Sequence, residues 1–78
     1  MHDVIYYTVE DENGFIFEEF DTLKEAKRWF RKNKSECIDR NKDIYICGFK
    51  QIRDNYEDVV EEEVAYEKKV YSKQEREN

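Results

Sequence analysis

Carboxyl groups are the side chains of this sequence that could most readily do chemistry, because 20 of its 78 residues are Asp or Glu. Two carboxyls held at different pKa values can act as a general acid and a general base. Neither spacing nor neighbouring residues single out one such pair here. A chain this short also has little room for a cleft that excludes water. We therefore expect a protein that is not an enzyme.

The residue types that most often bind metals or act as nucleophiles are scarce. The single histidine is His2, and Cys37 and Cys47 stand ten positions apart, so the close pairs of ligands that zinc sites use are missing. Gly14 and Gly48 are isolated, which leaves no glycine-rich phosphate loop. We expect no metal and no cofactor. Both cysteines are predicted to be free thiols that pack as small apolar side chains.

Composition suggests a small folded domain despite its high charge. Charged residues make up 44% of the chain and mean hydropathy is −1.12, values typical of disorder. Aromatic residues reach 15%, however, and each buries a large area in a core. No segment approaches the ~20 apolar residues of a membrane span, and no signal-peptide pattern opens the chain. We expect a cytoplasmic protein with one domain over residues 1–71 and a frayed polar tail over 72–78.

The first part of the chain predicts a β-hairpin. Residues 3–9 and 15–20 are rich in β-branched and aromatic types, and Asn13-Gly14 between them favours a type I′ turn. Alternation would place Ile5, Tyr7 and Val9 on one face of the first strand. In the second strand it would separate Phe15 and Phe17 from Ile16 and Phe20.

A helix is predicted next. Thr22 and Glu25 have the spacing of a capping box, and the apolar residues Leu23, Ala26 and Phe30 recur at helical intervals. We expect this helix to run to about Asn33 and a polar connection to follow over residues 35–42.

The remaining sequence is predicted to form a second hairpin. Residues 43–53 alternate strongly, and residues 54–58 resemble a turn. Residues 59–71 fit a strand, although a helix over 56–72 is the alternative, since Glu and Lys favour helix while Val and Tyr favour strand. We prefer the strand. The expected fold is therefore an α+β domain of ββαββ type, a four-stranded antiparallel sheet with one helix packed on one face.

Charge is arranged in blocks that the net value of −6 conceals. Residues 1–23 and residues 54–67 each carry seven acids and no base, whereas residues 24–34 carry six bases and one acid. The predicted hairpins are thus acidic and the helix between them is basic. Such polarisation concerns association with other molecules rather than catalysis.

The second acidic block suggests a binding surface. If Val60, Val64, Tyr66 and Val70 point inward, then Glu61, Glu63 and Glu67 form an outward row with about 6.6–6.8 Å between neighbours two apart. A row of this kind could occupy a basic groove made for nucleic acid. A solvated strand face is the plainer interpretation. The candidate contacts, with Tyr56 or Tyr66 as an aromatic anchor, are Tyr56, Glu57, Asp58, Glu61, Glu62, Glu63, Tyr66 and Glu67.

The basic helix permits two alternatives. Lys24, Lys27, Arg28 and Arg31 could contact phosphates of a nucleic acid, although an overall pI near 4.8 argues against a general nucleic-acid binder. The helix of one copy could instead meet an acidic hairpin of a second copy, which would make the protein a structural homo-oligomer.

One stretch is similar to a known group of proteins. The residues concerned are Tyr7, Val9, Asp11–Gly14 and Phe20–Lys27, which together resemble small acidic proteins of phages and mobile elements of Gram-positive bacteria. Many of those are host-takeover or anti-defence factors, including inhibitors of nucleases and anti-CRISPR proteins, and several imitate nucleic acid with acidic surfaces. The resemblance implies an inhibitor that docks on a larger nucleic-acid-handling protein, and it carries over no catalytic residue.

Overall fold

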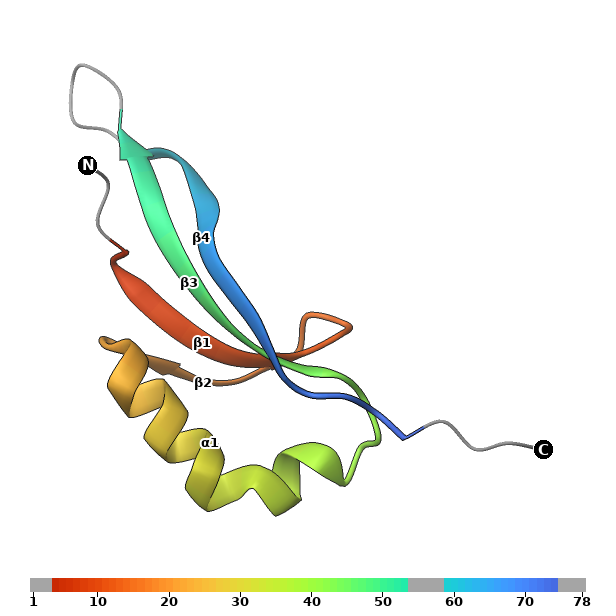
Figure 1. Ribbon diagram of the computed structural model, residues 1–78. Coiled ribbons are helices and arrows are strands. Elements are labelled where there is room, and N and C mark those ends of the chain that lie inside the picture. Colours follow the sequence, from red (N-terminus) through yellow and green to blue (C-terminus); the bar gives the residue numbers. More distant parts are fainter. Residues whose placement is uncertain (1–3, 54–58, 75–78) are drawn as a thin grey trace.

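The predicted ββαββ arrangement is confirmed. The computed structural model describes residues 4–53 and 59–74, with side chains for 4–52 and 62–74. The elements are β1 (Tyr6–Asp11), β2 (Ile16–Phe20), α1 (Leu23–Ile38), β3 (Ile44–Arg53) and β4 (Val59–Tyr71). The four strands form one sheet, and α1 lies against one of its faces (Figure 1). Because 59–71 form a strand, the helical alternative for 56–72 is wrong over those residues.

The strands are antiparallel throughout and follow the order β2-β1-β3-β4. β1 lies in the interior, where its residues pair with Ile44–Phe49 of β3 on one side and with β2 on the other. The rest of β3 and the start of β4 therefore run beyond Tyr6, the first residue of β1, as a two-stranded ribbon (Figure 1). The predicted turn over residues 54–58 lies outside the described residues.

The first hairpin closes with a different turn from the one expected. Gly14 has a φ of +84°, but Asn13 does not have a positive φ, whereas a type I′ turn requires two. The loop instead has three residues, with the Gly14 N–H donating to the Asp11 carbonyl at 3.0 Å. The Asp11 carboxylate explains this choice, because it accepts hydrogen bonds from the N–H groups of Asn13 and Phe15, both at 2.9 Å.

A bulge changes which residues of β2 face the core. Pairing shifts between Val9 and Glu10, whose partners are Glu18 and Ile16. As a result Phe17 and Phe20 both pack against the core, although simple alternation predicted them on opposite faces. Ile16 and Phe15 remain about half exposed, at 45% and 50%.

The start of α1 is as predicted and its end is not. Thr22 caps the helix by accepting a hydrogen bond from the Glu25 N–H at 3.2 Å, and its hydroxyl donates to the Glu25 carboxylate. Asn33, where the helix was expected to end, marks a kink at φ −112° and ψ 16°. Its side-chain amide donates to the carbonyl of Trp29, which an intact helix would offer to the Asn33 N–H. The helix then continues to Ile38, because this last part buries Cys37 in the core.

The core lies between α1 and the sheet. Val9, Ile44 and Ile46 are at most 1% exposed and meet Ala26 and Phe30 of the helix. Both cysteines are buried free thiols, as expected. Among the described residues no helix is long and apolar enough to cross a membrane.

Two residues of the polar tail expected over 72–78 contact the rest of the domain. The Lys73 N–H donates to the Asp43 carboxylate at 2.8 Å, and its amine contacts Glu12 at 3.3 Å. Gln74 exchanges hydrogen bonds with the side chain of Asn41. These contacts tie residues 73 and 74 to the two loops at this end of the sheet.

Candidate interaction surface

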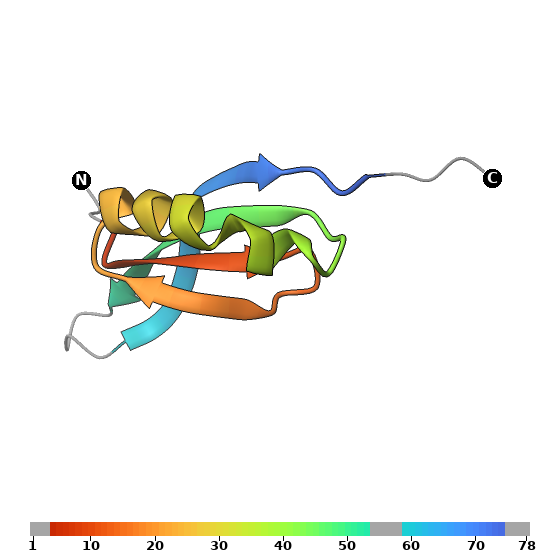
Figure 2. The ribbon, with the colours of Figure 1, turned by 90° about the horizontal axis from the view of Figure 1, so that it is seen from below.

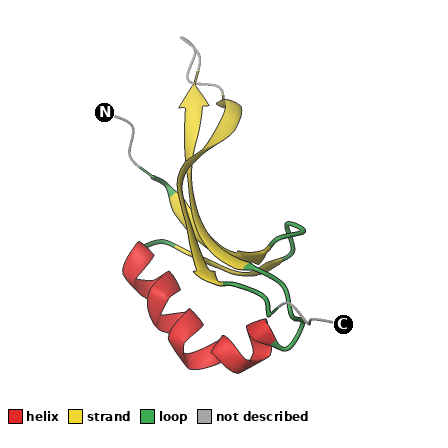
Figure 3. Cartoon of the chain, turned by 45° about the vertical axis from the view of Figure 1, so that its right-hand side comes forward, coloured by secondary structure: helices red, strands yellow, loops and turns green. Residues whose placement is uncertain are grey.

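The side of the sheet opposite α1 is not covered by any described element (Figure 3). Paired residues of an antiparallel sheet share a face, so the register assigns every other residue of each strand to this side. We call this side the open face. Its members on the described strands include Tyr6, Thr8, Glu10, Glu19, Tyr45, Cys47, Phe49, Glu62, Val64, Glu67 and Lys69.

Aromatic and aliphatic side chains occupy the open face where β1, β3 and β4 meet. The rings of Tyr6 and Phe49 stack with 5.0 Å between centroids and 20° between planes. Val64 lies opposite Phe49 in the register and is 51% exposed. This cluster gives the open face an apolar centre that solvent reaches, as in the anchors of protein interfaces.

Carboxylates lie around this apolar centre, and two of them accept hydrogen bonds from hydroxyl groups of the open face. The Tyr6 hydroxyl donates to Glu62 at 2.7 Å, and the Thr8 hydroxyl donates to Glu10 at 2.7 Å. Glu19 pairs with Thr8 from the β2 side, and Glu67 pairs with Cys47 from the β4 side. Carboxylates from β1, β2 and β4 thus lie around one apolar patch.

The negative charge of this face acts on the groups at its centre. The pKa of Tyr6 rises to about 12 because of burial, the hydrogen bond to Glu62, and the charges of Glu62, Glu19 and Glu10. The pKa of the Cys47 thiol also rises to about 12, first through burial and then through the charges of Glu10 and Glu67. A thiol that keeps its proton in this way is a poor nucleophile.

These carboxylates are not neutralised within the described part of the chain. The four ion pairs found there join Arg40 to Asp11, Lys50 to Glu63, Lys69 to Asp43 and Lys73 to Glu12. None involves Glu10, Glu19, Glu62 or Glu67. The one described cation on the open face, Lys69, has its amine 3.2 Å from Asp43. The open face therefore presents unpaired negative charge.

The predicted row of Glu61, Glu63 and Glu67 does not exist as a single row. Pairing shifts between Gly48 and Phe49, whose partners are Tyr66 and Val64, so one extra residue of β4 interrupts the alternation. Glu67 lies on the open face, whereas Glu63 is on the other face in an ion pair with Lys50 at 3.5 Å. Glu61 pairs with Ile52 in the backbone register, and its side chain lies outside the described residues.

The other binding residues proposed from the sequence also lie on different parts of the protein. Glu62 reaches the open face, but Tyr66 is half-buried on the helix side, where its ring meets Tyr7 edge-on at 6.1 Å. Tyr66 as an exposed anchor is therefore wrong. Tyr56, Glu57 and Asp58 lie outside the described residues. Lys24, Lys27, Arg28 and Arg31 are exposed on α1, on the side of the sheet away from the open face.

Sequence reasoning missed the residues that form the centre of this surface. The sequence marks Tyr6 and Phe49 only as strand formers, and Glu10 and Glu19 only as members of an acidic block. The alternation Tyr6, Thr8, Glu10 did contain a signal, since it assigns these residues to the face opposite Tyr7 and Val9. Their meeting with Phe49 and Glu62 depends on strand pairing across more than 40 positions of sequence.

No group of three or more His, Cys, Asp or Glu that could hold a metal ion occurs among residues 4–53 and 59–74. Comparison of the chain with family models, with curated proteins and with solved structures gave no match.

Proposed function

We propose that this protein is a non-enzymatic binding protein that docks its open face on a basic groove of a larger nucleic-acid-handling protein. One observation carries the proposal. The open face combines an accessible apolar centre with four carboxylates that no described cation neutralises. Charge of this kind repels nucleic acid and favours a partner rich in Lys and Arg.

The composition of the face suits a partner rich in arginine. Carboxylates accept paired hydrogen bonds from a guanidinium, and the faces of Tyr6 and Phe49 can receive the same cation. Glu10 and Glu19 lie on neighbouring strands of this face, and Glu67 lies across β1 and β3 from Glu19, so the negative charge extends over the width of the sheet. A groove built to bind phosphates would meet negative charge along its length.

The type of partner rests on the resemblance of residues 7–27 to phage and mobile-element proteins. Inhibitors of that kind act on nucleases and other host enzymes that handle nucleic acid. We assign the protein to the anti-defence type as part of the same proposal. Its role would be to occupy the groove and exclude the nucleic acid.

Affinity capture from a host lysate with a matched pair of variants tests this function. Glu19→Lys/Glu67→Lys reverses two charges of the open face, while Glu36→Lys/Asp39→Lys makes the same change in charge at the end of α1. We expect the wild type and the α1 variant to retain the same nucleic-acid-binding protein and the open-face variant to lose it. Added duplex DNA should release it, because both ligands would use one groove.

Three results would contradict the proposal. One is equal loss of the captured protein with both variants, and another is capture that DNA does not reduce. The third is self-association through the open face, measured by light scattering of the wild type and of Glu19→Lys/Glu67→Lys, which would assign the face to a second copy. Circular dichroism confirms that each variant is folded before capture.

A further inference from the structure

A second surface lies on the opposite side of the sheet, between α1 and β4. The helix packs on β1, β2 and β3, and β4 passes beside it (Figure 2). Between them is a groove of about 420 Å³ whose apolar part consists of Phe30, Ile46 and Val70. Its other lining residues are Lys27, Arg31, Lys34 and Lys68, together with Lys69, which the register assigns to the open face and whose amine lies 3.2 Å from Asp43.

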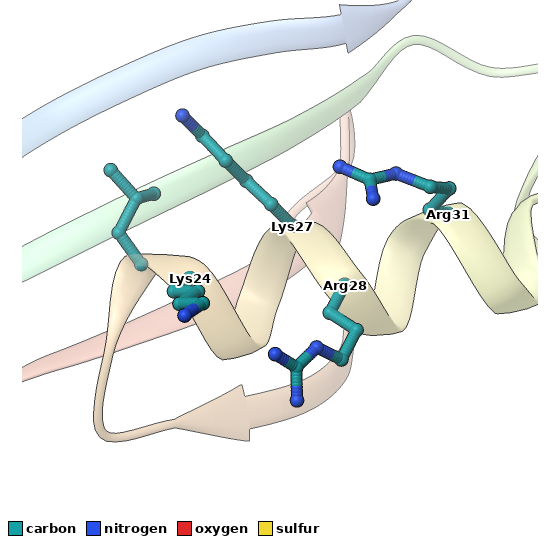
Figure 4. Close-up of a pocket in the computed structure, with 5 residues that line it drawn as sticks. Lys24, Lys27, Arg28 and Arg31 are labelled. Atoms are coloured by element: carbon teal, nitrogen blue, oxygen red, sulfur yellow. The ribbon is translucent and has the colours of Figure 1, made fainter.

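The groove continues along the helix. A second hollow of about 360 Å³ is lined by Leu23, Lys24, Lys27, Arg28 and Arg31, so the two hollows share Lys27 and Arg31. Figure 4 shows these two shared side chains on the side of α1 turned toward β3 and β4. From Lys24 to Lys34 the helix rises about 15 Å. We call the two hollows together the basic groove.

The positive charge of the basic groove is unbalanced. Among the residues whose side chains the structure describes, no Asp or Glu lines either hollow. Of the cations that line it, only Lys69 takes part in an ion pair with a described residue. Like charges three or four positions apart on a helix repel one another, as Lys24 and Arg28 or Lys27 and Arg31 do. A bound anion would relieve that repulsion.

The acidity of the whole chain does not cancel this charge locally. The unpaired carboxylates of the open face lie on the far side of the sheet from the basic groove. At physiological ionic strength charges are screened over about 8 Å. A ligand in the basic groove therefore responds mainly to the cations that line it.

From these observations we propose that the basic groove binds single-stranded nucleic acid. A linear polyanion matches cations that recur over about 15 Å of helix, and the guanidinium of Arg31 can bind a phosphate through two hydrogen bonds. Phe30 and Ile46 line the groove but are at most 8% exposed, so the partly exposed Val70 is the apolar residue that a base can contact. A duplex keeps its bases stacked inside and would touch only the rim, and an acidic homopolymer such as polyglutamate offers nothing to the apolar part.

Fluorescence anisotropy with a labelled oligothymidine strand of about 12 nucleotides tests this proposal. We expect saturable binding that weakens as salt is raised from about 50 to 200 mM, with a logarithmic slope near −3 for roughly four phosphate contacts. Unlabelled strand should compete better than a duplex of equal length or polyglutamate. Absence of an anisotropy change at about 100 μM protein in the lower salt, or stronger competition by duplex or by polyglutamate, overturns the proposal.

Matched variants locate the site. Lys27→Glu on α1 and Lys68→Glu on β4 should each weaken binding about tenfold, because each places a negative charge in the basic groove. Lys32→Glu makes the same change on α1 outside both hollows, beside Trp29, and should alter binding less than about twofold. An equal effect of Lys32→Glu, or no effect of Lys68→Glu, contradicts a groove between helix and strand.

Two further measurements are controls for strand binding. One excludes loss of folding as the cause of weaker binding, and the other distinguishes the basic groove from the open face. If a charge reversal prevents folding, judged by circular dichroism, Lys27→Gln/Lys68→Gln removes the same cations and should still weaken binding. Glu19→Lys/Glu67→Lys changes only the open face and should bind the strand at least as well as the wild type. Loss of strand binding in that variant would contradict a site on the helix side.

Discussion

The two faces of this sheet are made from alternate residues of the same strands and differ in almost every property. On the helix side Val9, Ile44 and Ile46 are excluded from water under α1. On the open face Val64 is 51% exposed, and Tyr6 and Phe49 stack without a covering element. The helix side carries unpaired cations at its rim, while the open face carries unpaired carboxylates.

This difference separates stability from association. Burial on the helix side supplies most of the free energy of folding, because α1 and the sheet remove that area from water. The open face contributes less to folding and keeps its charged and aromatic groups available. The four-stranded sheet places unpaired carboxylates on one face and unpaired cations on the other. The net charge of −6 does not reveal this separation.

The largest expected effect comes from truncating a buried aliphatic side chain on the helix side. The same kind of truncation on the open face serves as the comparison. Ile44→Ala should lower the free energy of unfolding by about 3 kcal/mol, since Ile44 is fully buried beneath the helix. Val64→Ala on the open face should lower it by less than about 1 kcal/mol. Urea denaturation measures both. Similar losses would mean that the open face is covered in solution.

Adding one methyl group on the helix side should destabilise the protein nearly as much as Ile44→Ala. A Cβ at Gly48 would lie 2.8 Å from Cε1 of Tyr7 and 3.0 Å from Cγ1 of Val4. Gly48→Ala should therefore destabilise the protein by about 2 kcal/mol as the Tyr7 ring is displaced. Thermal unfolding of the wild type and of Gly48→Ala is the measurement. An unchanged melting temperature in Gly48→Ala would show that Tyr7 moves freely.

Removing the helix cap should weaken the helix side and leave the open face unaltered. Thr22→Ala loses the hydrogen bond from the Glu25 N–H and should lower the free energy of unfolding by about 1 kcal/mol. The pKa of Tyr6, followed by ultraviolet difference titration, should stay the same in this variant. A shifted Tyr6 pKa would indicate that the two faces are coupled.

A further effect concerns pH and belongs to the open face. Tyr6 and Cys47 have pKa values raised to about 12 from 10.0 and 9.0, so the unfolded chain loses these protons at lower pH than the folded protein. Their contribution to stability is complete below pH 9 and is lost as pH rises toward 12. Tyr6→Phe should make the alkaline decline shallower, measured by urea denaturation across that range.

The charge of Glu62 can be tested in the same titration. Glu62→Gln removes a carboxylate beside Tyr6 and should lower the pKa of Tyr6 from about 12 toward its ordinary value of 10.0. Glu63→Gln is the control, since Glu63 points to the other face and pairs with Lys50. A drop of equal size in Glu63→Gln would contradict the register that separates these two neighbours.

The helix and the strands were predictable because capping residues and apolar alternation mark them within short segments of the sequence. Thr22 and Glu25 mark the start of α1, and the alternation around Ile44 and Ile46 marks β3. The errors arose where a local signal competes with packing. The helix was expected to end at Asn33, but burial of Cys37 extends it past a kink. The turn at Asn13-Gly14 was assigned from a dipeptide, and the Asp11 carboxylate selected another geometry.

The face of the sheet on which each side chain lies was less predictable than the helices and strands, because β-bulges change the alternation. An extra residue between Val64 and Tyr66 puts Val64 on the open face, although alternation predicted it inward with Tyr66, and it separates Glu63 from Glu67. A similar shift in β2 brings Phe17 and Phe20 to the same side. Sequence alternation carries no mark of either bulge, since both depend on how neighbouring strands pair.

The amino-acid sequence by itself determined the fold class, the order of the elements and the division of charge into blocks, because these follow from propensities and patterns within short segments. Tertiary structure alone decided which charges meet. It placed Tyr6 beside Glu62 and Phe49, and it placed Lys68 of β4 in a groove with Lys27 and Arg31 of α1. Such contacts join residues far apart in the chain, and they depend on strand order and register, which arise only when the whole sheet forms.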